Sequence, residues 1–64
     1  MLTSKVKNLS VVKLVDGREA TILEVFDYPD KPLAYLVEIV VDGNGPLVDV
    51  MHDQVEAVIW DPEA

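Results

Sequence analysis

The sequence predicts an all-β fold of five short strands, and three observations lead to that prediction. An Asp-Gly pair at 16–17 lies between two apolar runs, which is a strong local signal for a tight β-hairpin. Apolar and polar residues alternate with a period of two in several short segments. No segment has the apolar periodicity of a helix longer than one turn, so strands and turns are expected throughout.

The first two strands are predicted at 10–15 and 18–26, joined by the turn at 16–17. Asp and Gly tolerate the positive φ angles of a type I′ turn, so Gly17 is expected at φ > 0. The apolar residues of 18–26 cannot all point to one face of the sheet. A β-bulge near Leu23–Glu24, or a strand buried on both faces, explains this pattern.

A loop with two prolines is predicted at 27–32, and the clearest strand follows it at 33–41. In this strand, Glu38 marks one face as exposed to water. The other face is apolar and is expected to point into the core: Tyr35, Val37, Ile39 and Val41. The chain then continues with a turn, a strand, a 3₁₀ turn and a last strand, at 42–46, 47–51, 52–54 and 55–60.

Five strands joined in this way describe a small five-stranded SH3-like barrel with one 3₁₀ turn before the last strand, a fold that closes its own sheet edges. The prediction divides the chain into an N-terminal arm at 1–9, the barrel at 10–61 and a tail at 62–64. The arm is expected to be frayed, with an edge strand near Val6 as the alternative.

Three stretches also resemble one family: VVKLVDGREATILEVF (11–26), AYLVEIV (34–40) and VDVMHDQVEAV (48–58). They look like a group of short bacterial SH3-like barrel proteins of unknown function, and the resemblance covers residues 10–60. Ala20 stands where that family usually has glycine. Some members are encoded beside toxin-like genes, so the resemblance implies an immunity or antitoxin role.

The charge distribution argues against nucleic acid and membrane surfaces as partners. The chain has a formal net charge of −7, and no Lys or Arg follows Lys31. Phosphate backbones and anionic lipids are bound by clusters of basic residues, which this sequence lacks. It also lacks an apolar run that could span a bilayer and the apolar block of a signal peptide, so a cytoplasmic location is expected.

No catalytic, cofactor or metal site is expected, and the protein is predicted not to be an enzyme. The chain has no cysteine, and its one histidine, His52, lies near Asp49 and Asp53 at positions that partly point apart. The DGNG stretch at 42–45 lacks the Gly and Glu that a calcium loop needs at later positions. A barrel of five short strands is filled by its own side chains, which leaves too little volume for a substrate.

The candidate interface combines one loop residue with the outer faces of two strands: Leu23, Tyr28, Leu36, Glu38 and Val40. If Tyr35 points into the core, the apolar members on the strands form an outer patch, and such patches commonly mark interfaces. Coverage of that patch by residues 1–8 is the alternative. Tyr28 either contacts a ligand or covers the barrel as part of a loop lid.

These observations predict a non-catalytic protein-interaction module that offers an acidic surface to a protein partner, expected to be basic, with an immunity or antitoxin role as one form. The alternative is a structural or accessory barrel that forms a homodimer through the outer face of 33–41 and has no dedicated ligand. A nucleic-acid-binding barrel is a third and less favoured reading.

Overall fold

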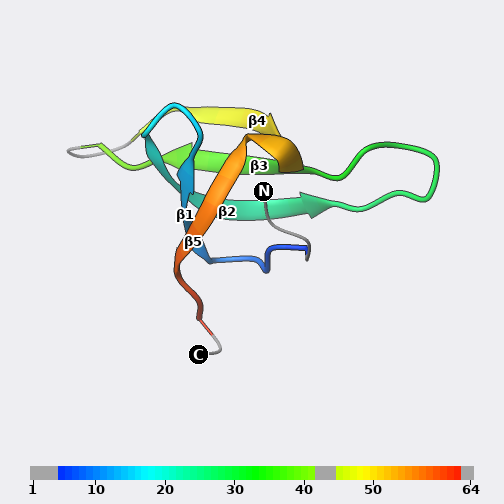
Figure 1. Cartoon of the computed structure of the whole chain (residues 1–64), viewed down its shortest axis with the longest axis horizontal. Helices are drawn as coiled ribbons and strands as arrows, with labels where there is room; N and C mark the ends of the chain where they lie inside the picture. Colours follow the sequence, from blue (N-terminus) through cyan, green and yellow to red (C-terminus); the bar gives the residue numbers. More distant parts are fainter. Residues whose placement is uncertain (1–4, 42–44, 63–64) are drawn as a thin grey trace.

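The computed structural model describes residues 5–41 and 45–62, which form a single antiparallel sheet of five strands (Figure 1). The strands are β1 (Val11–Leu14), β2 (Glu19–Phe26), β3 (Ala34–Ile39), β4 (Leu47–Met51) and β5 (Val55–Trp60), with the 3₁₀ turn η1 (His52–Gln54) before β5. The described residues contain no α-helix. The all-β prediction is therefore confirmed, while the turn predicted at 42–46 lies largely outside the described residues.

The strand order in the sheet is β4-β3-β2-β1-β5. β2, β3 and β4 form an antiparallel meander, and β1 pairs with both β2 and β5. Figure 1 shows β1 and β5 crossing the meander at a steep angle, so that the core lies between the two parts of the strongly twisted sheet. β4 and β5 are its two edges, and no pairing joins them within the described residues. Barrel closure therefore stays a prediction.

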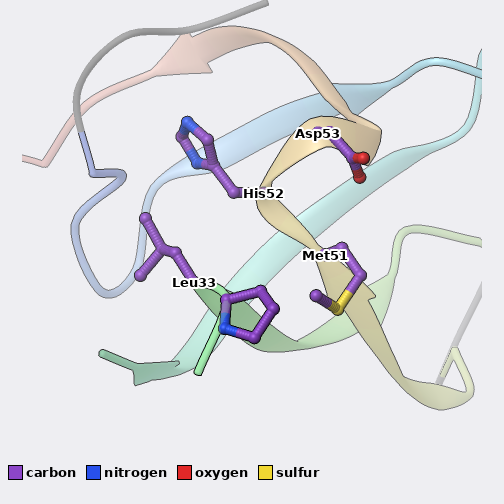
Figure 2. Close-up of a pocket in the computed structure, with 5 residues that line it drawn as sticks. Leu33, Met51, His52 and Asp53 are labelled. Carbon is purple, nitrogen blue, oxygen red and sulfur yellow. The ribbon is translucent and has the colours of Figure 1, made fainter. Parts of the chain in front are cut away.

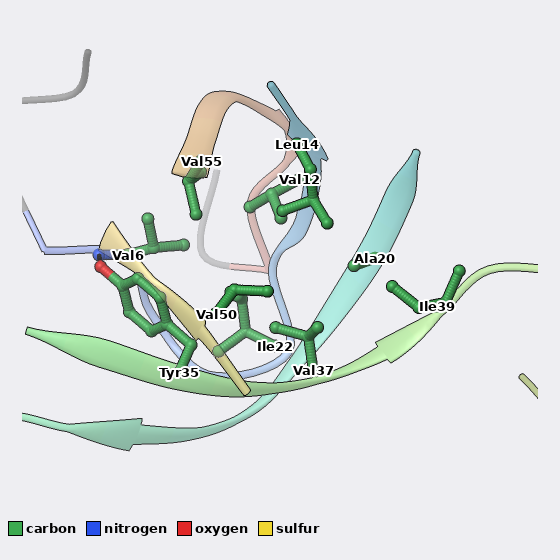
Figure 3. Packing of buried hydrophobic residues seen from close by; sticks show 10 residues of the cluster. All are labelled: Val6, Val12, Leu14, Ala20, Ile22, Tyr35, Val37, Ile39, Val50 and Val55. Carbon is green, nitrogen blue, oxygen red and sulfur yellow. Dashed lines mark hydrogen bonds between the residues drawn. The ribbon is translucent and has the colours of Figure 1, made fainter. Parts of the chain in front are cut away.

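The core consists of ten buried apolar residues drawn from the arm and all five strands: Val6, Val12, Leu14, Ala20, Ile22, Tyr35, Val37, Ile39, Val50 and Val55 (Figure 3). Side chains alternate across a strand, so Tyr35, Val37 and Ile39 all point inward from β3, as predicted. The inward placement of Val41 is wrong. Because β3 ends at Ile39, Val41 lies beyond the covered sheet and is 51% exposed.

The hairpin between β1 and β2 has a three-residue loop. The Leu14 N–H donates to the Arg18 carbonyl at 2.8 Å, and the Gly17 N–H donates to the Leu14 carbonyl at 2.9 Å. Gly17 has φ = 95°, which confirms the predicted positive φ. The type I′ assignment is wrong, because Leu9 is the only non-glycine residue with positive φ in the described chain, and that turn type requires it at Asp16 as well.

The Asp16 side chain accounts for this loop geometry. Its carboxylate accepts the Arg18 backbone N–H at 3.0 Å and Nε of the Arg18 side chain at 2.7 Å. The hydrogen bond from the Arg18 backbone is the main cause that holds the pKa of Asp16 below its usual value. The aspartate thus stabilises the turn through its side chain, a common role for Asp in turns.

The bulge predicted at Leu23–Glu24 is confirmed. Ile22 lies opposite Val37 and Glu24 lies opposite Leu36, so Leu23 has no partner of its own on β3. The extra residue shifts the alternation of β2 by one position. Ile22 before the bulge and Val25 after it can therefore both face the core.

The described part of the N-terminal arm packs against the core. Val6 is 3% exposed, and its N–H donates to the Tyr35 hydroxyl at 3.1 Å (Figure 3). Further along, the Leu9 N–H donates to the Ile22 carbonyl at 2.7 Å. The segment 5–10 is therefore anchored to the sheet by Val6, Leu9 and Ser10, of which Val6 and Ser10 are buried, although it forms no strand.

Candidate protein-interaction surface

The outer face of the meander places one apolar side chain between two carboxylates. Leu36 lies directly opposite Glu24 on β2 and Asp49 on β4. The next outward residue of β3, Glu38, lies between Thr21 and Leu47. Residues directly opposite in an antiparallel pair share a face of the sheet. We call this surface the acidic face and define it by Glu24, Leu36, Glu38, Leu47 and Asp49.

No basic residue of the meander offsets this charge. β2, β3 and β4 contain four acids, Glu19, Glu24, Glu38 and Asp49, and neither Lys nor Arg. No salt bridge within residues 5–41 and 45–62 reaches any of these four carboxylates. The acidic face therefore carries uncompensated negative charge.

Three of the basic side chains are paired elsewhere in the chain. Lys5 contacts Asp27 at 3.0 Å, Lys13 contacts Glu56 at 3.7 Å, and Arg18 contacts Asp16 at 2.7 Å. These ion pairs are exposed, so each adds little stability. Their consequence is electrostatic, since they neutralise three acids outside the meander and leave the carboxylates of the acidic face without a basic partner.

A pocket of about 250 Å³ adjoins this face where the β2–β3 loop meets η1 (Figure 2). Its lining is mostly apolar and consists of Pro32, Leu33, Met51, His52 and Asp53. The His52 N–H donates to the Leu33 carbonyl at 2.9 Å, which joins the two walls. Met51 lies on the same side of β4 as Asp49, two residues away, so this residue of the pocket lining belongs to the same side of the sheet as the acidic face.

A contact with the core residue Tyr35 orients the His52 ring in the pocket wall. Its Nδ1 lies 2.7 Å from the Tyr35 hydroxyl, which also accepts the Val6 N–H. The hydroxyl therefore holds the ring on its Nδ1 side, whichever of the two groups supplies the hydrogen. This hydrogen bond gives His52 a structural role.

The structure brings four of the five predicted interface residues to the outer side of the sheet. Leu36 and Glu38 belong to the acidic face, and Leu23 lies in the bulge beside Glu24. Val40 follows β3, where it is 49% exposed and its N–H donates to the Glu19 carbonyl at 2.8 Å. The described arm residues do not cover Val40.

Tyr28 does not belong to the strands that form this surface. It lies in the β2–β3 loop and is 54% exposed, so it does not act as a lid over the core. Nζ of Lys31 lies 6.0 Å from the centroid of its ring. The Tyr28 ring thus already has a lysine of the same chain at the outer limit of cation–π distance.

Sequence reasoning missed the pocket. Its walls come from a proline-containing loop and a 3₁₀ turn that are far apart in the chain, and neither has a periodic pattern. The β3–β4 register brings them together, because it sets Ala34 opposite Met51. Only the pairing register of 33–41 with 47–51 could have predicted this pocket from the sequence.

Neither a metal cluster nor a membrane-spanning helix is found in the part of the chain that the structure describes. His, Asp and Glu side chains there form no group of three that could hold a metal ion. No helix there has the length and apolar character needed to cross a bilayer. No known protein family matches the chain, and no curated protein or solved structure is significantly similar to it.

Proposed function

We propose that this protein is a non-catalytic interaction module, built on an SH3-like barrel, whose acidic face binds a basic surface of another protein. The strand order β4-β3-β2-β1-β5 and the 3₁₀ turn before β5 support the SH3-like assignment. An immunity or antitoxin role is one form of this proposal. A toxin-like gene beside this one would favour that form.

The observation that carries the proposal is the position of Leu36 between Glu24 and Asp49. Protein interfaces commonly combine an apolar centre with a polar rim. A face of one charge speeds the encounter with an oppositely charged partner and disfavours partners of like charge. Because β2, β3 and β4 contain no Lys or Arg, no basic side chain of these strands offsets the negative charge of the face.

The same charges disfavour a symmetric dimer through this face. A two-fold axis near Leu36 would bring Glu24, Glu38 and Asp49 close to their own copies. Like charges across an interface are costly. The basic side chains of Lys5 and Lys13 pair with Asp27 and Glu56 of the same chain. A basic partner therefore suits the face better than a second copy.

Carbodiimide coupling tests this proposal, because it joins a carboxylate directly to a lysine amine that contacts it. The tagged protein is purified from the native host together with its bound partner. The complex is treated with carbodiimide, and the joined residues are identified by mass spectrometry. We expect partner lysines to be joined to Glu24, Glu38 or Asp49. We also expect Asp49→Lys to abolish capture of that partner, while Asp30→Lys, on an exposed loop, retains it. The proposal is contradicted if Asp49→Lys still captures the partner, or if the cross-links involve only other acids.

A further inference from the structure

We infer that the pocket at the end of β4 holds an apolar side chain of an extended partner segment, which adds to the open edge of β4 and places a Lys or Arg against Asp49. This inference rests on the proposed function and specifies the partner. Its parts are the pocket, the backbone of the β4 edge and the carboxylates beside it.

The size and lining of the pocket suit one side chain. Its volume of about 250 Å³ is below the range of roughly 300–1,000 Å³ that is usual for small-molecule sites. Pro32, Leu33 and Met51 supply apolar walls, and Asp53 adds a carboxylate. Figure 2 shows that the labelled lining residues come from two parts of the chain, with Leu33 on one side and Met51, His52 and Asp53 on the other. An apolar side chain entering this space loses contact with water and gains apolar contacts.

The backbone of β4 can accept an additional strand. Two hydrogen bonds define its pattern, from the Ile39 N–H to the Pro46 carbonyl at 3.0 Å and from the His52 N–H to the Leu33 carbonyl at 2.9 Å. Bonded and non-bonded pairs alternate in an antiparallel ladder, so Val48 and Val50 bond to β3. The N–H and C=O groups of the intervening residues, Leu47, Asp49 and Met51, then point to the open edge.

One of these edge groups is already occupied within the chain. The Met51 N–H donates to Oε1 of Gln54 at 2.7 Å, so the Gln54 side chain takes the place that a neighbouring strand would have. The backbone groups of Leu47 and Asp49 remain directed outward from β4. Extended peptides use such groups for affinity and side-chain pockets for specificity.

Charge complementarity selects the residue that follows the anchor. Met51 lines the pocket, and Asp49 is the next residue on that side of β4. Side chains of an added strand also recur on one side every second residue. An apolar anchor beside Met51 therefore sets a residue two positions away beside Asp49, where Lys or Arg is favoured. The ligand is an extended segment with an apolar residue and a basic residue two positions apart.

Blocked threonine-rich heptapeptides test this inference by two-dimensional amide NMR with the complete protein. The first carries Leu and Lys two positions apart, the second has Glu in place of Lys, and the third has Leu and Lys adjacent. We expect the first to shift the amides of Leu33, Asp49 and Met51. We expect affinity to fall about fivefold or more for each of the other two, as for loss of a favourable charge contact.

Two edge-strand variants serve as a matched pair. Met51 on β4 and Val58 on β5 are both 39% exposed. Met51→Glu is expected to weaken the first peptide about tenfold, because it places a charge in the apolar pocket, and Val58→Glu is expected to leave binding unchanged. Unchanged spectra at millimolar peptide, equal affinity for the three peptides, or shifts confined to β5 overturn the inference.

The same variants separate this inference from the proposed function. A host partner that is lost with Asp49→Lys but kept with Met51→Glu supports the acidic face and overturns the pocket. If the peptide binds at the pocket and the host partner still binds the Asp49→Lys variant, the pocket is supported and the proposed role of the acidic face is contradicted.

Discussion

The Tyr35 hydroxyl lies 2.7 Å from Nδ1 of His52, and this contact joins the centre of the core to the wall of the surface pocket. Tyr35 is fully buried, yet its one polar atom has two partners, because it also accepts the Val6 N–H at 3.1 Å. The N-terminal arm, β3 and η1 therefore meet at a single oxygen atom.

Removing that oxygen should destabilise the fold. Tyr35→Phe leaves the Val6 N–H buried without its acceptor, and an unsatisfied buried group costs about 1–3 kcal/mol. We expect the free energy of unfolding in urea to fall by that amount. Tyr28→Phe is the control, because Tyr28 is exposed, and it should match the wild type. Equal stability of Tyr35→Phe and Tyr28→Phe would show that the hydroxyl contributes nothing.

Alkaline pH should destabilise the protein through the same residue. Burial is the main cause that raises the pKa of Tyr35, and the hydrogen bond from Val6 partly opposes it. The folded state therefore holds this proton more tightly than the unfolded chain, in which tyrosine has a pKa of about 10. The resulting stability is fully present below about pH 10 and is lost as the pH rises through the folded-state pKa.

Phenolate absorbance of Tyr28→Phe, in which Tyr35 is the only tyrosine, measures this shift. We expect a midpoint above about 10 in the folded protein. Unfolding in urea should also show a loss of stability above that pH in the wild type and a smaller loss in Tyr35→Phe. A midpoint at the value of the unfolded chain contradicts the raised pKa.

The conformation of Gly17 predicts a difference between two substitutions. Its φ of 95° is strained for residues with side chains, although an added Cβ would meet no atom within 4 Å. Gly17→Val should therefore cost about 1–3 kcal/mol from backbone strain alone. Gly17→Asn should cost less, because asparagine tolerates positive φ better than a β-branched residue. Thermal unfolding that ranks the two variants equally would argue against this loop geometry.

Nucleic acid should not bind. The net charge is −7, and Lys5, Lys13 and Arg18 are paired with acids of the same chain. Phosphate binding requires available basic groups, whose effect also weakens with salt. We expect no binding of single- or double-stranded oligonucleotides in the micromolar range at about 0.15 M salt, measured by fluorescence anisotropy. A micromolar complex under these conditions would contradict the expectation.

Local patterns were sufficient to predict much of this fold. The alternation at 33–41 placed Tyr35 and Val37 in the core, and its failure at Leu23–Glu24 predicted the bulge. In both cases the neighbouring residues alone contain the signal, because side-chain direction on a strand follows a period of two.

Features that depend on distant contacts could not be predicted in this way. Val6 lies in a segment without periodicity, and its backbone N–H bonds to the hydroxyl of Tyr35, which is 29 residues away in the sequence. The loop type was wrong because the Asp16 carboxylate bonds to Arg18, a contact that dipeptide preferences do not include. On the acidic face, the position of Leu36 beside Asp49 required the register of two strands.

The pairing of β1 with β5 has a consequence for biosynthesis. Val12 on the first strand lies opposite Val58 on the last, so the two residues of this pair are separated by most of the sequence of the domain. On a ribosome, β2, β3 and β4 can pair with near neighbours as they emerge, since contacts between nearby residues form quickly. The core still lacks Val55 at that stage, and β1 has no partner on its outer edge. The nascent domain therefore completes its fold only after β5 has left the ribosome, with an unpaired strand edge exposed until then.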